Sequence, residues 1–167
     1  PHGESAKISL EIPNNIKIVD LGADFRLEDP LMWEKYYGGD HAGTWPYGLP
    51  ELFREQIVGV KRVANPGCYA TAISLSIAPI SKYIENDIVV VAASGTTGAG
   101  RSAKINLLGS EVMGSLTSYK FGGVHQHTPE IEEALTQVAG SEVKISFTPI
   151  LAPMPRGILS TVTAKLT

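Results

Sequence analysis

Residues 60–84, VKRVANPGCYATAISLSIAPISKYI, decide the fold of this chain, because a short strand, a sharp turn and a long helix follow one another directly. Val60 to Ala64 has the pattern of a short buried strand. Pro66-Gly67 turns the chain, and apolar residues then recur at helical spacing from Ala70 to Ile84, which predicts a helix that buries one face. Pro79 lies within it, so we expect a kink there.

The only cysteine of the chain, Cys68, stands at the start of this helix. A thiol there faces unpaired backbone N–H groups and the positive end of the helix dipole, which both favour the thiolate. Gly67 lets a substrate approach closely, and the side-chain amide of Asn65 is placed to donate to a developing oxyanion. A lone cysteine is more often a small buried hydrophobic residue. Its position between Pro-Gly and a helix favours a nucleophile instead.

Two histidines, His125 and His127, lie just before a second predicted helix, which begins with Thr128 as its cap and ends at Gly140. Spaced by two on an extended segment, their rings can reach one site. An imidazole can accept the thiol proton and return a proton to the leaving oxygen. The rigidly held His127 suits this acid–base role and His125 suits substrate binding. A single loop histidine is more commonly structural, and one cysteine with two histidines makes no zinc set.

A glycine-rich run, residues 94–101, follows a predicted strand from Ile88 to Ala93. It matches neither a P-loop nor a Gly-x-Gly-x-x-Gly fingerprint. Its glycines could wrap the nicotinamide end of a cofactor or a phosphate; they are Gly95, Gly98 and Gly100. Arg101 can clamp a carboxylate with two N–H groups. Further candidates for phosphate or carboxylate recognition are His2, Asp24 and Arg26, although a surface salt bridge is the default for any single arginine.

The remaining segments predict an α+β fold with a mixed or antiparallel sheet and helices, preceded by the tail of an α/β Rossmann-type layer. Residues 16–21 read as a buried parallel strand, residues 30–37 as a short helix entered through Pro30, and residues 38–50 as an ordered loop. Residues 142–150 and 157–167 read as two further strands, the last of them antiparallel. We expect residues 1–64 to be the tail of this α/β layer with its connecting loops, and residues 65–167 to form the α+β domain.

Composition excludes several classes of protein. The 167 residues are 43% hydrophobic and 19% charged, with a net charge of −3 and no basic tract that would bind nucleic acid. The apolar runs are too short for a membrane span, and a single cysteine fits a reducing, cytoplasmic location. The chain begins without methionine and ends within a predicted strand, so we expect a fragment of a longer protein.

Several blocks together resemble the N-acetyl-gamma-glutamyl-phosphate reductases, whose wider relatives include aspartate-semialdehyde and glyceraldehyde-3-phosphate dehydrogenases. The blocks are residues 20–27, 47–52, 63–72, 94–101, 125–131 and 155–159. The resemblance implies that residues 1–64 are the tail of a nucleotide-binding α/β domain. It also implies that residues 65–167 form a C-terminally incomplete, glyceraldehyde-3-phosphate dehydrogenase-like catalytic and dimerisation domain, through which homodimers or homotetramers assemble. It implies that Cys68 attacks a small acyl phosphate and forms a thioester, which NADPH reduces to a semialdehyde. His127 would be the acid–base partner, and Arg101 and Arg26 would contact substrate anions.

The chain departs from this family in two respects. The glycine-rich nucleotide-binding turn of the family is absent, so we expect this chain alone to bind NADPH weakly or not at all and to turn over little substrate. Thr97 stands where serine is more usual. A paralogue that reduces a carrier-linked aminoadipyl phosphate in lysine synthesis fits the same blocks. A cysteine hydrolase using Cys68 and His127, and a non-enzymatic oligomerisation module, are the alternatives from other classes.

Overall fold

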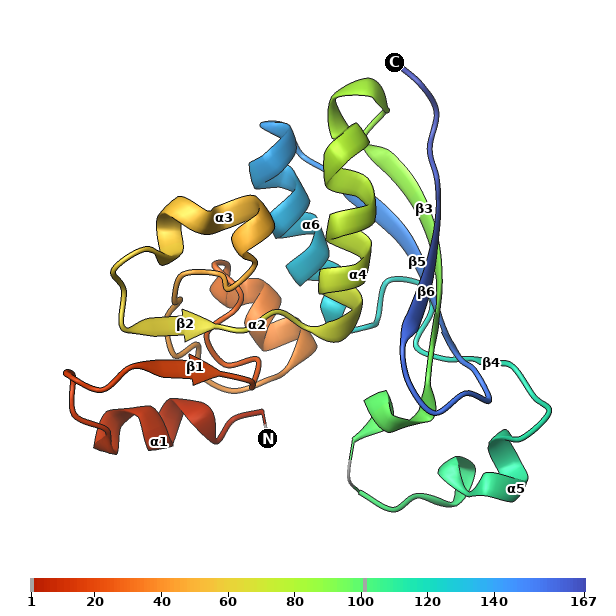
Figure 1. Ribbon diagram of the computed structural model, residues 1–167, viewed down its shortest axis with the longest axis horizontal. Helices are drawn as coiled ribbons and strands as arrows, with labels where there is room; N and C mark the ends of the chain where they lie inside the picture. The colour runs from red at the N-terminus through yellow and green to blue at the C-terminus, as the bar shows by residue number, and fades with distance from the viewer. Residues whose placement is uncertain (1, 101) are drawn as a thin grey trace.

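The computed structural model describes residues 2–100 and 102–167. Two sheets organise the chain (Figure 1). In the smaller, β1 (Ile18–Asp20) pairs in parallel with β2 (Arg62–Ala64). The larger has the strand order β4-β5-β3-β6 and mixes parallel with antiparallel pairs. The predicted α+β class with a mixed sheet is therefore confirmed.

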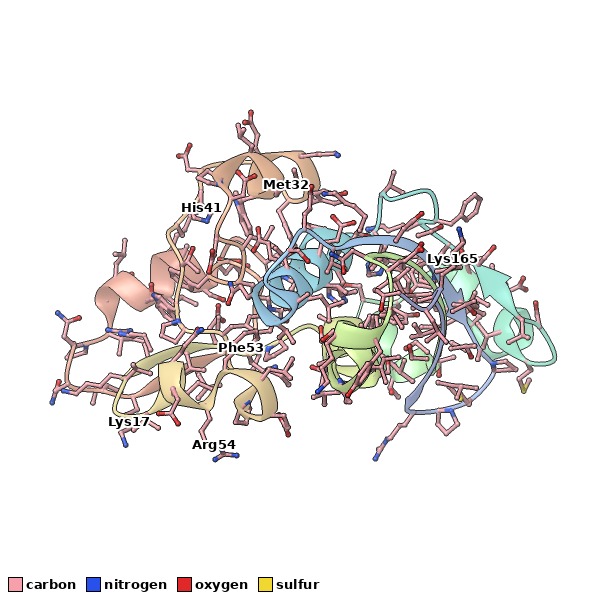
Figure 2. The ribbon with its side chains drawn as sticks, turned by 90° about the horizontal axis from the view of Figure 1, so that it is seen from above. Lys17, Met32, His41, Phe53, Arg54 and Lys165 are labelled. Carbon is pink, nitrogen blue, oxygen red and sulfur yellow. The ribbon has the colours of Figure 1, made fainter. Side chains whose placement is uncertain are left out.

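Three helices surround the two-stranded sheet: α1 (Ser5–Glu11), α2 (Pro30–Tyr36) and α3 (Pro50–Ile57). Figure 2 shows this part of the molecule beside the larger sheet and its helices. The predicted helix at residues 30–37 is confirmed, and the side chain of Asp29 caps it by accepting the N–H of Leu31 at 2.8 Å. The predicted loop 38–50 contains no helix or strand before α3, but Tyr47 forms an isolated bridge with Ala64.

The larger sheet consists of β3 (Asp87–Ser94), β4 (Thr117–Ser118), β5 (Lys144–Leu151) and β6 (Ile158–Thr163). β5 runs parallel to β3, whereas β6 is antiparallel to β3 and β4 is antiparallel to β5. Between β3 and β4 the described residues form short helices, which Figure 1 shows below the sheet. They are η2 (Thr96–Ala99), η3 (Ile105–Leu107) and α5 (Gly109–Val112). The predicted antiparallel last strand is confirmed.

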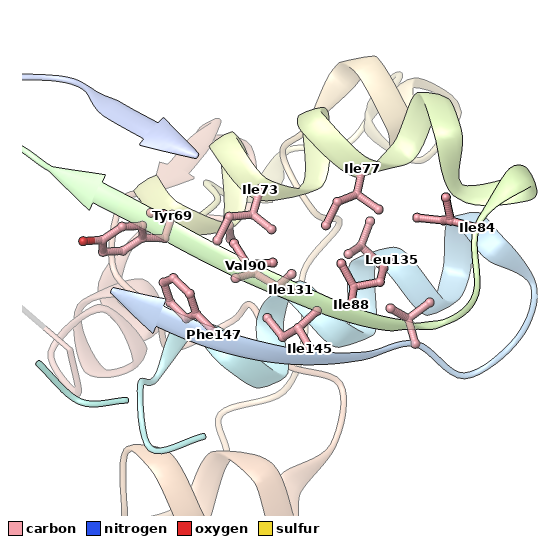
Figure 3. Close-up of a cluster of buried hydrophobic side chains, with 13 residues drawn as sticks. Tyr69, Ile73, Ile77, Ile84, Ile88, Val90, Ile131, Leu135, Ile145 and Phe147 are labelled. Atoms are coloured by element: carbon pink, nitrogen blue, oxygen red, sulfur yellow. The ribbon is translucent and has the colours of Figure 1, made fainter. Parts of the chain in front are cut away.

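Helices α4 (Cys68–Ile77) and α6 (His127–Ala139) cover one face of this sheet and enclose the main core. Figure 3 shows Ile73 of α4 near Val90 of β3, and Leu135 of α6 near Ile88 of the same strand. Burying an aliphatic side chain of this size contributes about 1.5–3 kcal/mol. This packing fixes the N-terminal ends of both helices, where Cys68 and His127 lie.

The end of α4 and the start of α6 differ from what the sequence predicts. After α4 ends at Ile77 the chain continues as a 3-10 helix, η1 (Ala78–Tyr83), because Pro79 has no N–H to donate to an α-helical turn. The expected kink thus takes the form of a change of helix type. The prediction that Thr128 caps α6 is wrong: the helix begins at His127, whose N–H is capped by the Nδ1 atom of His125 at 3.1 Å.

No helix of the described residues is long and apolar enough to cross a membrane.

Candidate active site

Cys68 is delivered to the start of α4 by β2 and the turn at Pro66-Gly67. Cys68 is exposed to solvent. The backbone N–H groups of Cys68 and Tyr69 stand in the first turn of α4, where a helix leaves its N–H groups without helical acceptors. The predicted placement of the thiol at a helix N-terminus is confirmed.

The thiol nevertheless has a raised pKa, which reverses the expected lowering. Burial is the largest cause: although Cys68 reaches solvent, the surrounding protein removes water from its sulfur. The hydrogen bonds from the two backbone N–H groups lower the pKa, and the charge of Glu130 raises it further. The resting cysteine is therefore a neutral thiol at neutral pH and needs a base to become a nucleophile.

The imidazole of His127 lies against the turn that precedes Cys68. A methyl group added to Gly67 would stand 2.5 Å from Nε2 of His127 and 2.9 Å from Cδ2. Burial lowers the pKa of His127, the charge of Glu130 opposes this, and that of Arg26 adds to it. The ring is therefore neutral at neutral pH and able to accept a proton. The structure thus brings the predicted base next to the turn that carries the predicted nucleophile.

His125 is buried beside this pair, with its ring edge-on to Tyr69 at 5.3 Å. Burial and then the charge of His127 are the largest causes that lower the pKa of His125 to about 3. Its Nδ1 accepts the N–H of His127, so the proton of the neutral ring is on Nε2. That N–H is a donor, as the predicted role in substrate binding requires.

Glu130 was missed by sequence reasoning, which read it only as an acid in the first turn of α6. The side chain is buried: Oε1 accepts the N–H of Gly67 and the hydroxyl of Tyr47, both at 2.7 Å, and Oε2 lies 3.4 Å from Nη1 of Arg26. One carboxylate thus joins the turn before Cys68 to the helix of His127. Its spacing of three from His127 was the available signal, because such residues share a helix face.

The predicted anion contacts have different environments. Arg26 is buried, pairs with Glu130 and donates from Nη2 to the carbonyl of Leu21 at 3.1 Å. The exposed His2 packs edge-on to Tyr37 at 5.4 Å, and its pKa is lowered first by burial and then by the charge of Arg26. Arg101 lies outside the described residues. For all three, contact with substrate stays a prediction.

Asn65 and Asp24, two further predicted site residues, form hydrogen bonds within the protein. The side-chain amide of Asn65 donates to the carbonyl of Pro66 at 3.0 Å, so one of its hydrogens is engaged within the turn. Asp24 binds the N–H groups of Gly3 and Ala6 at 2.7 and 3.0 Å and holds the start of the chain over β1.

Four backbone N–H groups of the glycine-rich run are already engaged within the protein. The backbone N–H groups of Gly95, Thr96 and Thr97 donate to the carbonyls of Gly157, Met154 and Pro155, and that of Gly98 donates to Gly95. These four donors are engaged within the protein, so the suggested phosphate contact through them is not supported. Gly100 adopts a φ of +89°, which favours glycine. Contact with a nicotinamide ring stays a prediction for Gly95, Gly98 and Gly100.

A known protein family matches the part of the chain that begins at the candidate nucleophile. The family described as semialdehyde dehydrogenase, dimerisation domain, matches residues 68–167, which begin at Cys68 itself. The chain belongs to this family. Within the described residues, no group of three or more histidine, cysteine or acidic side chains is arranged to hold a metal ion.

Two curated relatives carry a more specific name than the family does. The chain is 62% identical over 170 residues to the N-acetyl-gamma-glutamyl-phosphate reductase of Acidothermus cellulolyticus, and 57% identical over 169 residues to that of Streptomyces avermitilis. Each match covers 99% of this chain, but 50% and 49% of the relative. The chain therefore spans about half the length of the curated relatives it matches.

Solved structures share the fold at low sequence identity. Aspartate semialdehyde dehydrogenase II from Vibrio cholerae superposes with a TM-score of 0.68 at 16% identity, covering 99% of this chain and 53% of that one. The enzyme from Candida albicans, solved with NADP, gives 0.59 at 12% identity, covering 98% and 48%. These likenesses establish the fold.

Proposed function

We propose that this chain supplies the nucleophile and the acid–base group of an N-acetyl-gamma-glutamyl-phosphate reductase. The observation that carries the proposal is the position of His127 against Gly67, next to a thiol at the start of α4. The names and identities of the curated relatives support the choice of substrate.

Proton transfer between the two side chains begins the proposed reaction. Because the pKa of Cys68 is raised and that of His127 is lowered, both rest in their neutral forms. When the acyl phosphate binds, Nε2 of His127 takes the thiol proton and the sulfur attacks the acyl carbon. The carbon–oxygen bond to phosphate breaks, a thioester forms, and the departing phosphate receives the proton from His127.

The second half returns the sulfur to its resting state. Bound in the whole protein, NADPH would supply a hydride to the acyl carbon. The semialdehyde then departs as the carbon–sulfur bond breaks, the bonding electrons stay on sulfur, and the thiolate takes up a proton from solvent through His127. The neutral His125, with its proton on Nε2, donates to the substrate oxygen that becomes negative in each step. We propose no nucleotide phosphate contact through the N–H groups of residues 95–98, since these four donors are engaged within the protein.

The decisive experiment is an assay of the whole protein that contains this chain. Phosphate and NADP are added with N-acetylglutamate semialdehyde or, in parallel, with a carrier-linked aminoadipate semialdehyde, and NADPH formation is followed. We expect turnover with the first substrate that is lost in Cys68→Ala. Turnover with the second alone would assign the lysine pathway, and turnover unaffected by Cys68→Ala would overturn the proposal.

We further propose that the whole protein forms a homodimer or homotetramer through the outer face of the four-stranded sheet. The family description names a dimerisation domain. On this face Val89, Val91 and Leu159 are 48%, 40% and 68% exposed, opposite the face that α4 and α6 cover. Apolar side chains grouped on a sheet are a favourable surface for a second copy.

A further inference from the structure

The site requires a cation that can meet a negatively charged substrate. The proposed acyl phosphate carries a phosphoryl group and an amino-acid carboxylate, and both are anionic at neutral pH. Arg26, the cation expected there, is 94% buried and engaged by Glu130 and a carbonyl. Moving it onto substrate would leave Glu130 as an unpaired buried charge, which is costly. Since Arg101 stays a predicted contact for one of the two anionic groups, a further cation is needed for the other.

We propose that Lys120 binds an oxyanion of the substrate, either its carboxylate or its phosphoryl group. This inference rests on the proposed function. Lys120 is exposed, and its Nζ atom donates to Oε1 of Gln126, the residue between His125 and His127. Its ammonium group is thus held at the segment that carries both histidines, while its surface stays open to solvent.

The neighbouring residue, Tyr119, ties the segment of Lys120 to the residue that follows the nucleophile. Tyr119 donates its N–H to the carbonyl of Pro149 at 3.1 Å and its hydroxyl to that of Tyr69 at 3.0 Å. Tyr69 directly follows Cys68, and the Tyr119 ring lies 5.8 Å from that of His125. The backbone of Lys120 is therefore fixed within one residue of the aromatic side chains that line the site.

The backbone of Lys120 is itself unusual. Its φ of +44° makes it the one residue other than glycine with a positive φ in the described part of the chain. Lysine does not favour this conformation, and such residues concentrate at functional sites, where surrounding structure holds them. The left-handed turn ends the extended direction of β4 and directs the chain back toward Gln126.

The ammonium group of Lys120 also acts electrostatically on both histidines. After burial, the positive charge of Lys120 is among the causes that lower the pKa of both His125 and His127. A charge that acts on both rings also acts on an anion bound between them. Lysine is a compact point charge and a common ligand of phosphate and carboxylate.

The test uses the whole protein in the oxidative direction, in which phosphate and semialdehyde are separate substrates with separate KM values. Lys120→Asn removes the charge, and asparagine tolerates a positive φ. Lys120→Arg keeps the charge. Lys82→Asn is the control, because Lys82 lies over the Tyr83 ring on η1, away from the site. Melting temperatures check that each variant folds, and Lys120→Gly replaces Lys120→Asn if the latter does not.

We expect Lys120→Asn to raise one of the two KM values by at least about tenfold, with kcat changed less than about threefold. Both KM values of Lys120→Arg and of Lys82→Asn should stay close to those of the wild-type protein. A higher KM for phosphate assigns the phosphoryl group, and a higher KM for semialdehyde assigns the carboxylate. If both KM values of Lys120→Asn stay within about twofold of wild type, the proposal is overturned. An inactive wild-type protein would overturn the proposed function instead.

Discussion

Gly67 and His127 are in such close contact that a single methyl group cannot be placed between them. The Cβ of an alanine at position 67 would stand 2.5 Å from Nε2 and 2.7 Å from Cε1 of the imidazole. The missing side chain therefore sets how near the base comes to the chain that carries the nucleophile.

We accordingly expect Gly67→Ala to lower kcat/KM by at least about a hundredfold, because a base displaced by about 1 Å is misplaced for proton transfer. The backbone of Gly67 itself, with a φ of −64°, accepts alanine, so the fold should survive. Gly109→Ala is the control, since the nearest atom to its Cβ is 4.0 Å away. Activity of the purified whole protein measures both. Full activity in Gly67→Ala would show that His127 is not the base.

Removing the Glu130 carboxylate should destabilise the protein strongly. Glu130→Ala leaves the buried Arg26 without its partner and the N–H of Gly67 without its acceptor, and such a loss costs about 3–5 kcal/mol. Glu142→Ala, which breaks an exposed pair with Lys144, should cost less than about 1 kcal/mol. Urea unfolding of the whole protein gives both values. A small loss in Glu130→Ala would mean that Arg26 finds another partner or water.

Stability should fall as the pH is lowered from about 6.5 toward 3. The pKa of His125 is 6.5 when unfolded and about 3 when folded, so in this window the unfolded chain binds more protons. Each such histidine contributes a slope of at most about 1.4 kcal/mol per pH unit, and the lowered pKa of His127 adds to it.

Unfolding free energies at several pH values check this dependence. His125→Asn should flatten the slope, because asparagine carries no titrating group but can still accept the N–H of His127. An unchanged slope in His125→Asn would show that other groups cause the acid sensitivity.

Alkylation of Cys68 should require a higher pH than alkylation of a free cysteine. Since burial raises the pKa of the thiol, the iodoacetamide rate should continue to rise above the pH at which a cysteine-containing peptide has levelled off. Mass spectrometry of the labelled whole protein follows the rate, with the peptide as reference. A midpoint below that of the peptide would contradict the raised pKa and restore the original expectation of a resting thiolate.

Assembly should depend on the outer face of the sheet. Leu159→Asp places a charge on this face and should shift the whole protein toward monomer in light-scattering chromatography. Leu10→Asp is the matched control, because Leu10 is 88% exposed on α1, away from the sheet. An unchanged oligomer in Leu159→Asp would exclude this part of the sheet as the interface.

The sequence by itself determined the elements in which local pattern decides structure. A proline, a glycine and an apolar run place Cys68 at a helix start, and β-branched residues at regular spacing produce the strands of the larger sheet. These features depend on neighbouring residues and on which side chains avoid water, and both are properties of the chain itself.

Only the tertiary structure decided how the site works. The pKa of the thiol depends on how much water the folded protein removes from it, and the role of Arg26 depends on Glu130, 104 residues away along the chain. Lys120 reaches Gln126, the residue between the two histidines, and the strand that leads to it, β4, is positioned by pairing with β5. Burial and contacts between distant residues set these energies, and neither is a local property of the sequence.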